Sequence, residues 1–168
     1  MNYAKIRNYD IANGEGVRVT LFVSGCTNNC PDCFNKDEQD FNFGEKYTPE
    51  CEEDILRLVS NSVISGLSIL GGDPLCQNPE GLNMLIRLCD RVHSMGKDVW
   101  LWTGFTWDNI MSHGLAEQKE LLRHCDIVVD GLFKRDLASR ALKWRGSSNQ
   151  RVIDVERSLK HHEVILYE

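Results

Sequence analysis

Short runs of apolar and β-branched residues alternate along the chain with longer segments whose apolar residues recur at helical spacing. The run 17–23 (VRVTLFV) predicts a strand that ends at Gly25. Apolar residues recur every three or four positions over 49–64, which predicts a helix, and Thr48 is suited to be its N-cap. The apolar face of this helix is expected to comprise Ile55, Leu58, Val59 and Val63.

The same alternation continues through the rest of the chain. A strand is predicted over 67–70, followed by a helix that includes 82–92 and stops at Gly96. A strand over 99–103, one or two short helices over about 106–123 and a strand over 126–130 follow. The apolar face of the helix before Gly96 would comprise Leu82, Leu85, Ile86, Cys89 and Val92. Glycines follow the strands, as in Gly71-Gly72-Asp73-Pro74.

Strands that alternate with helices predict an α/β fold with parallel strands joined by right-handed crossovers. A closed eight-stranded βα barrel needs about 250 residues, and this chain has 168. We therefore expect a single domain over 1–168, built as a partial (βα) barrel or an open curved sheet. The carboxyl ends of parallel strands meet at one edge, so the site is expected in the loops there, including a loop over 24–35.

Composition and charge narrow the possible functions. A content of 42% hydrophobic and 26% charged residues is typical of a folded globular protein. The net charge of −6 gives no positive surface for nucleic acid or anionic membranes. The first ten residues lack the apolar core of a signal peptide, and no apolar run approaches the roughly 20 residues that span a bilayer. We therefore expect a cytoplasmic protein.

The spacing of the cysteines indicates a metal site. Of the seven cysteines, Cys26, Cys30 and Cys33 lie within one short loop. A structural zinc site closes with four protein ligands, whereas three thiolates on an iron-sulfur cubane leave one iron open to a small molecule. The alternative is a zinc site that takes Cys76 as its fourth ligand. The remaining cysteines, Cys51, Cys89 and Cys125, are expected to be buried as small hydrophobic residues.

The motif Cys26-x3-Cys30-x2-Cys33 is similar to that of the radical S-adenosylmethionine (SAM) enzymes. The segments around it, Asn13-Gly14-Glu15-Gly16-Val17-Arg18 and Cys33-Phe34-Asn35, resemble the signature of the glycyl-radical-enzyme activases. Within that family, residues 100–104 (WLWTG) and 144–150 (WRGSSNQ) resemble the members that act on the anaerobic ribonucleotide reductase. The resemblance runs from about residue 2 to 155.

This resemblance implies one 4Fe-4S cluster bound by the three loop cysteines, with SAM at the open iron. It also implies SAM contacts from the turn at Gly71, Gly72 and Asp73, from the end of a strand at Thr103 and Gly104, and from Asp130. Adenine packing would fall to the loop around Asp32, Cys33 and Phe34. The chain departs from the family pattern at Asp73, where glutamate is commoner, at Asp32, where an aromatic residue is common, and at Glu15, where the signature has proline.

The activity implied is that of an oxidoreductase like the formate-C-acetyltransferase-activating enzyme. Such an enzyme would cleave SAM and leave a glycyl radical on its partner, the large subunit of the anaerobic ribonucleotide reductase. A small electron donor such as flavodoxin would supply the electron. Two alternatives stay open, namely a radical SAM enzyme that acts on a small molecule and a non-enzymatic zinc or iron-sulfur module. Three roles stay open for the segment 145–151. It would bind SAM, it would dock the partner, or it would be a solvent-exposed loop without a role in the site.

Overall fold

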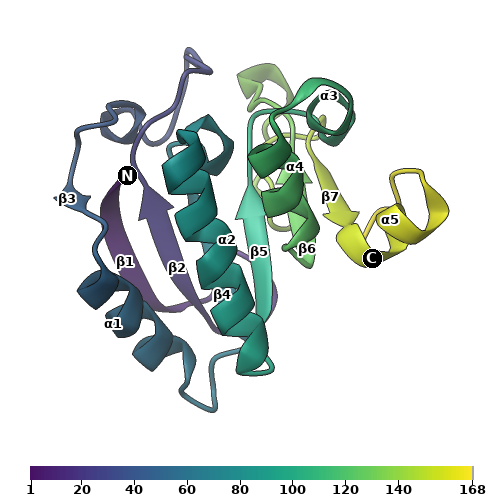
Figure 1. Ribbon diagram of the computed structural model, residues 1–168. Coiled ribbons are helices and arrows are strands. Elements are labelled where there is room, and N and C mark those ends of the chain that lie inside the picture. Colours follow the sequence, from purple (N-terminus) through teal and green to yellow (C-terminus); the bar gives the residue numbers. More distant parts are fainter. Residues whose placement is uncertain (168) are drawn as a thin grey trace.

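The computed structural model describes residues 1–167, which form one sheet of seven strands in the order β3-β1-β2-β4-β5-β6-β7 (Figure 1). The strands are β1 (Asn2–Asp10), β2 (Arg18–Val23), β3 (Glu45–Lys46), β4 (Gly66–Gly71), β5 (Asp98–Trp102), β6 (Ile127–Asp130) and β7 (Arg151–Asp154). The helices are α1 (Pro49–Val59), α2 (Pro79–Ser94), α3 (Trp107–His113), α4 (Ala116–Arg123) and α5 (Val155–His161). Short 3-10 turns are η1 (Asp37–Gln39), η2 (Pro74–Cys76) and η3 (Arg135–Leu137).

Only the four central strands of the sheet are parallel. β2, β4, β5 and β6 run parallel to one another, whereas β1 and β3 at one edge and β7 at the other pair antiparallel to their neighbours. The predicted bounds of the central strands are confirmed to within one residue. The expectation of parallel strands alone is wrong at both edges, because β1 and β7 join the sheet through connections that contain no crossover helix.

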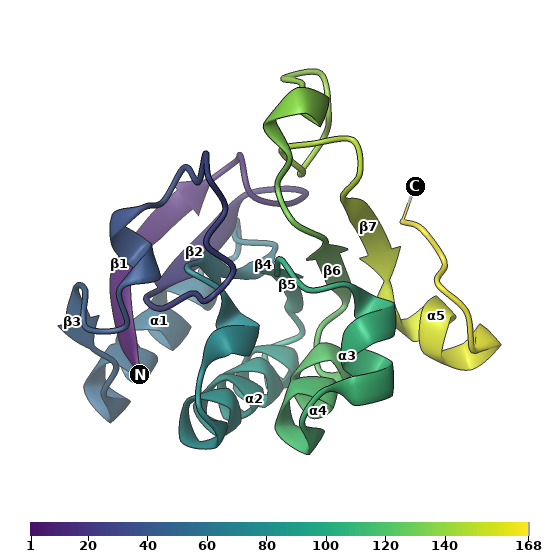
Figure 2. The same cartoon turned by 90° about the horizontal axis from the view of Figure 1, so that it is seen from above.

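The sheet is open in the described residues. β3 and β7 are the two ends of the strand order and do not pair with each other. Within residues 1–167 the sheet therefore does not close into a barrel. Of the two forms expected from the sequence, a partial barrel or an open curved sheet, the structure has an open sheet. Figure 2 shows α1 to α4 on one side of this sheet and irregular segments on the other.

Side chains of the central strands alternate between a helix-covered face and an open face, as the two-residue period of a strand requires. In β2, Val19 and Leu21 belong to the main core under the helices, while Thr20 and Phe22 lie on the open face. The main core also takes Leu67 and Ile69 of β4, Val99 and Leu101 of β5, Val128 of β6 and Ile153 of β7. Cys51, Cys89 and Cys125 are buried, which confirms their expected role in packing.

α1 begins as expected and ends early. Thr48 caps its N-terminus by accepting a hydrogen bond from the Cys51 backbone N–H, and Pro49 occupies the first turn. The helix ends at Val59 instead of 64, because Ser60 and Asn61 form local side-chain to backbone hydrogen bonds that compete with helical ones. Val63 is therefore exposed and does not belong to the apolar face predicted for this helix.

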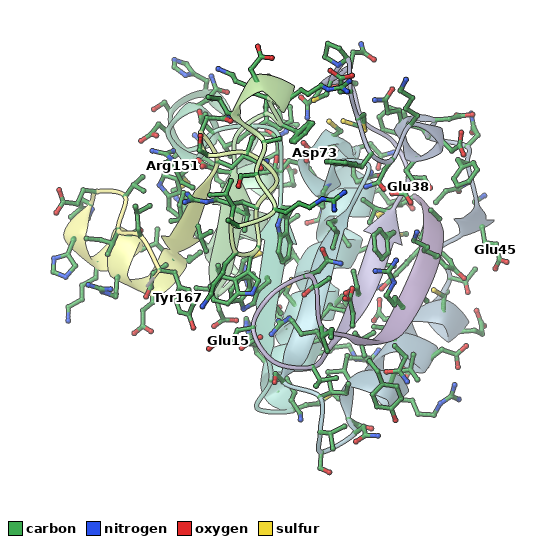
Figure 3. All side chains as sticks on the ribbon, turned by 180° about the vertical axis from the view of Figure 1, so that it is seen from behind. Glu15, Glu38, Glu45, Asp73, Arg151 and Tyr167 are labelled. Atoms are coloured by element: carbon green, nitrogen blue, oxygen red, sulfur yellow. The ribbon has the colours of Figure 1, made fainter. Side chains whose placement is uncertain are left out.

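An aromatic cluster covers part of the open face. Trp100 packs edge to face against Trp144 and Tyr167, with ring centroids 5.1 and 5.5 Å apart. Arg18 is fully buried beside Trp100 and forms a 2.5 Å ion pair with the carboxylate of Asp98. Figure 3 shows Tyr167 beside Glu15, whose carboxylate accepts a hydrogen bond from the Tyr167 hydroxyl. These contacts hold the C-terminal residues against the sheet.

Among residues 1–167, no helix is both long enough and apolar enough to cross a bilayer.

The carboxylate of Glu52 fastens α1 to α2. It is 2% exposed and accepts hydrogen bonds from Arg87 at 3.0 Å, Arg91 at 2.9 Å and the Tyr47 hydroxyl at 3.0 Å. Burial raises the pKa of Glu52, but the hydrogen bonds from Arg87, Arg91 and Tyr47 outweigh it and hold the pKa below its ordinary value of 4.5. The ionised form is thus the one that stabilises the fold.

We predict that Glu52→Gln lowers the free energy of unfolding at pH 7 by about 1–3 kcal/mol, because the arginines lose a charged acceptor. A lowered folded-state pKa gives stability that is complete above the unfolded-state pKa and disappears as the pH falls through the folded-state value. The difference between the variant and the wild type should therefore shrink between pH 7 and ~3.5. Urea denaturation at both pH values measures it, with the exposed Glu163→Gln as control. An equal difference at both pH values would contradict this role.

Candidate functional site

The carboxyl ends of β2, β4 and β5 border a cavity of about 540 Å³ on the open face. Its volume lies within the range of small-molecule sites, roughly 300–1,000 Å³. Among the residues that line it are Lys5, Arg7, Asn13, Phe22, Cys26, Asn28, Cys30, Cys33, Phe34, Gly71, Gly72, Asp73, Trp102, Thr103, Gly104, Phe133, Trp144, Arg145 and Gln150. The expectation of a site at the strand ends thus matches the position of this cavity.

The three loop cysteines all line this cavity. They are free thiols of intermediate exposure. Backbone N–H groups point at two of the sulfurs, from Asn28 to the Cys26 Sγ and from Asn35 to the Cys33 Sγ, each at 3.4 Å. The backbone N–H groups of Gly25 and Cys26, at the start of the loop, donate hydrogen bonds to carbonyl groups of η1. These bonds hold the loop in place.

These residues fit an iron-sulfur cluster. Soft thiolate ligands suit iron-sulfur clusters, and backbone N–H groups directed at the sulfurs stabilise ligands that carry negative charge. Burial raises the pKa of the Cys30 thiol, and a backbone hydrogen bond from Phe133 acts in the opposite direction. A metal bound there would keep this thiol ionised. The donor set thus offers three thiolates on one loop, all facing one cavity.

Asp73 joins the loops that surround the cavity. It is 1% exposed, and its Oδ2 accepts hydrogen bonds from the Asn28 side chain at 2.7 Å, the Gly104 N–H at 2.8 Å and the Thr103 hydroxyl at 3.0 Å. Its Oδ1 accepts from the Leu75 N–H at 2.9 Å. Burial raises the pKa of the Asp73 carboxyl, and the four hydrogen bonds oppose that rise. Figure 3 shows Asp73 at the strand ends.

Two glycines after Leu70 allow the chain to pass close to neighbouring backbone. Gly71 has a φ of +109°, and a Cβ there would lie 2.6 Å from the Val23 carbonyl oxygen. A Cβ on Gly72 would lie 2.5 Å from the carbonyl oxygen of Gly25. The turn at 71–74 is therefore packed directly against the first residues of the cysteine loop.

The other residues predicted as cofactor contacts divide into two groups. Phe34, Thr103 and Gly104 line the cavity, and the Phe34 ring packs at 4.9 Å from Phe133. Asp32 and Asp130 do not line it. Asp32 lies at the outer side of its loop, where it forms an ion pair of 2.9 Å with Arg135.

Asp130 lies on the helix-covered side of the sheet, because it is two residues after Val128 and strand side chains alternate. Its carboxylate accepts from the first backbone N–H of α3, at Trp107, and pairs with Arg151 at 2.6 Å. Asp130 therefore braces β6, β7 and α3, and the prediction that it contacts the cofactor finds no support in this geometry.

The segment 145–151 forms part of the cavity wall instead of a freely solvated loop. Arg145, Gly146 and Gln150 line the cavity. The Gln150 side chain accepts hydrogen bonds from the Gly146 and Ser147 N–H groups and donates one to the Gly131 carbonyl. The polar residues of segment 145–151 thus stabilise the turn beside the cavity.

The sequence analysis missed three polar side chains of the cavity. Lys5 and Arg7 reach it from β1, where both lie over the Phe22 ring. The alternation in Ala4-Lys5-Ile6-Arg7 was a weak strand signal, but nothing in the sequence linked it to the cysteine loop. Asn28 lay inside that loop, and only the fold shows that it reaches Asp73.

Cys76 lies next to Cys26. The two sulfurs and a carboxylate oxygen of Asp73 all lie within 4.8 Å of one another. The Thr27 N–H also donates to the Cys76 Sγ at 3.4 Å. The geometry therefore brings the alternative zinc ligand close to the cluster loop.

Comparisons with known proteins place this chain among iron-sulfur proteins. A family described as a "4Fe-4S single cluster domain" matches residues 12–153. The anaerobic ribonucleoside-triphosphate reductase-activating proteins of Salmonella typhi and of Escherichia coli (strain K12) are 41% and 40% identical to this chain over 154 residues. Each comparison covers 89% of this chain and 96% of the relative. The protein of that name from Enterobacteria phage T4 is 37% identical over 153 residues, covering 90% of this chain and 93% of its own.

We predict that Asp73→Asn lowers the free energy of unfolding by about 1–3 kcal/mol. An amide has only one acceptor oxygen, so its NH2 group must face either the Leu75 N–H or the three donors at Oδ2. Urea denaturation of the cluster-free protein measures the change. Asp37→Asn, at an exposed position of η1, is the matched control. Equal stability of both variants would show that Asp73 does not hold the loops together.

We predict that Cys76→Ala still takes up one 4Fe-4S cluster on anaerobic reconstitution, whereas Cys26→Ala loses it. The physical reason is that the cysteine loop already provides three thiolates on the cavity wall. Iron, sulfide and zinc analysis of both variants measures the outcome. Loss of the cluster in Cys76→Ala, or zinc bound to the wild type in place of iron, would establish Cys76 as a fourth ligand.

Proposed function

Because the chain belongs to the family of anaerobic ribonucleoside-triphosphate reductase-activating proteins, we propose that it activates such a reductase by forming a glycyl radical on it. The observation that carries this proposal is the placement of all three loop thiols on the wall of one cavity that is large enough for a small molecule. The match of residues 12–153 to a single-cluster 4Fe-4S domain supports the same conclusion.

Cys26, Cys30 and Cys33 would hold the cluster, and SAM would occupy the cavity beside it. A cluster held there would supply one electron for the reductive cleavage of SAM to methionine, and the deoxyadenosyl group released would take up a hydrogen atom from a glycine Cα and leave as 5′-deoxyadenosine. Three protein ligands would suffice for this chemistry, because SAM would take the position that they leave open.

The residues of the cavity position and shield the reactants. Gly71 and Gly72 allow close approach of the backbone, and Asp73 fixes the loops that carry Asn28 and Gly104. The rings of Phe22 and Trp102 on the wall, which are buried and half-buried, exclude water. Holding the electron source and the sulfonium in one site replaces an encounter between separate molecules. No general acid or base is required.

The reaction class is that of an oxidoreductase similar to the formate-C-acetyltransferase-activating enzyme. The partner is the large glycyl-radical subunit of the reductase, and a small electron donor such as flavodoxin delivers the electron. The half-exposed cysteine loop is accessible to such a donor.

The test is anaerobic reconstitution followed by electron paramagnetic resonance of the reduced protein before and after addition of SAM. We expect a 4Fe-4S signal that SAM perturbs, followed by methionine, 5′-deoxyadenosine and a glycyl radical signal when the reductase is added. Cys30→Ala should lose all of these signals, whereas Cys125→Ala, at a buried position far from the loop in sequence, should keep them. A cluster that does not respond to SAM, or SAM cleavage without a glycyl radical on the reductase, would refute the proposal.

A further inference from the structure

The segment 132–145, between β6 and β7, differs in charge from the rest of the chain. It contains five basic residues and one acidic residue, whereas the whole chain has a net charge of −6. The basic residues are Lys134, Arg135, Arg140, Lys143 and Arg145. We call residues 132–145 the basic segment. Residues 134–141 within it are all exposed.

The basic segment is held in a fixed position although it is so exposed. The Lys134 backbone N–H donates to the hydroxyl of Ser147, which is fully buried, and the Ser148 N–H donates to the Leu137 carbonyl. The Asn149 side chain donates to the Leu132 carbonyl at 2.8 Å. Polar residues that follow the segment thus fix its backbone, so that its outward side chains are presented at defined positions.

The basic segment forms one rim of the cavity. Phe133, Leu142 and Trp144 line the cavity, and the residues between them project outward. Figure 2 shows this green segment on the side of the sheet opposite α2 and α4. It also touches the cysteine loop through the Arg135–Asp32 ion pair and the Phe34–Phe133 contact.

Exposed apolar side chains lie among these charges. Leu132 and Leu137 are 41% and 42% exposed, and the neighbouring Phe34 is 80% exposed. Lys134 and Arg140 have no ion pair within residues 1–167. A surface with positive charges around a few apolar side chains is typical of one that binds an acidic partner with an apolar centre.

We propose that the basic segment is the docking surface for the reductase, and that it binds an acidic surface beside the loop that carries the target glycine. The proposal rests on the proposed function, in which a protein backbone must enter the cavity. A glycine loop that enters the cavity has to cross its rim, and the basic segment forms both rim and wall. An electron donor needs only to approach the cluster and has no need to cross this rim.

The test compares two double variants with the same change in net charge. Lys134→Glu/Arg140→Glu reverses two exposed charges that do not line the cavity. The control, Lys119→Glu/Arg157→Glu, reverses two charges on α4 and α5, outside the cavity wall. Dithionite serves as reductant, so that docking of an electron donor does not enter the measurement. Glycyl radical is measured against reductase concentration at low and high salt, and SAM cleavage is measured without reductase.

We expect the basic-segment variant to need about tenfold more reductase for half-maximal radical formation, with the same maximum and the same SAM cleavage. The control variant should match the wild type. High salt should weaken the wild type more than the basic-segment variant, because screening removes an attraction that the variant no longer has.

An unchanged half-saturating concentration in the basic-segment variant would overturn the docking proposal while the proposed function stands. A defect that appears only when an acidic flavoprotein replaces dithionite would assign the segment to the electron donor, which also overturns it. Absence of a glycyl radical with the wild-type protein itself would refute the proposed function and the docking proposal together.

Discussion

The carboxylate of Asp73 is the interaction on which the geometry of the site depends. Its two oxygens accept hydrogen bonds from the cysteine loop through Asn28, from the end of β5 through Thr103 and Gly104, and from its own turn through Leu75. A buried carboxylate is costly unless its acceptors are satisfied, so these segments are stable only when they meet. The close approach of Gly71 and Gly72 to the neighbouring backbone then sets the distance between them. The result is a cavity whose walls come from separate parts of the chain.

One face of the sheet forms the hydrophobic core, and the other carries the cavity. Apolar residues of the central strands pack under the helices and supply the core, whereas the open face carries Arg18, Trp100 and the cavity. The antiparallel edges complete the open face. β1 brings Lys5 and Arg7 to the cavity, and the connection between β6 and β7 brings Phe133 and Trp144. The parallel centre therefore carries the stable core, and the edges shape the site.

The basic segment connects the cavity to the surface of the molecule. Its inward side chains line the cavity, its outward charges face solvent, and Arg135 and Phe133 contact the cysteine loop. A partner bound to this surface would therefore contact the basic segment, which itself contacts the loop that carries Cys26, Cys30 and Cys33. This arrangement suits an enzyme whose substrate is a segment of another folded protein, since docking and insertion take place at adjacent surfaces.

Local patterns determined the central strands, the start of α1, the burial of Cys51, Cys89 and Cys125, and the three-cysteine motif, because periodicity, capping and ligand spacing are properties of neighbouring residues. Several residues that the motif resemblance singled out, including Gly71, Gly72, Thr103 and Gly104, lie on the cavity wall. Tertiary structure alone decided the antiparallel edges, the meeting of Asn28 with Asp73, the position of Cys76 beside Cys26 and the turn of Asp130 away from the cavity. These features depend on strand pairing and on which face a residue occupies. Both are fixed only when distant segments pack against each other.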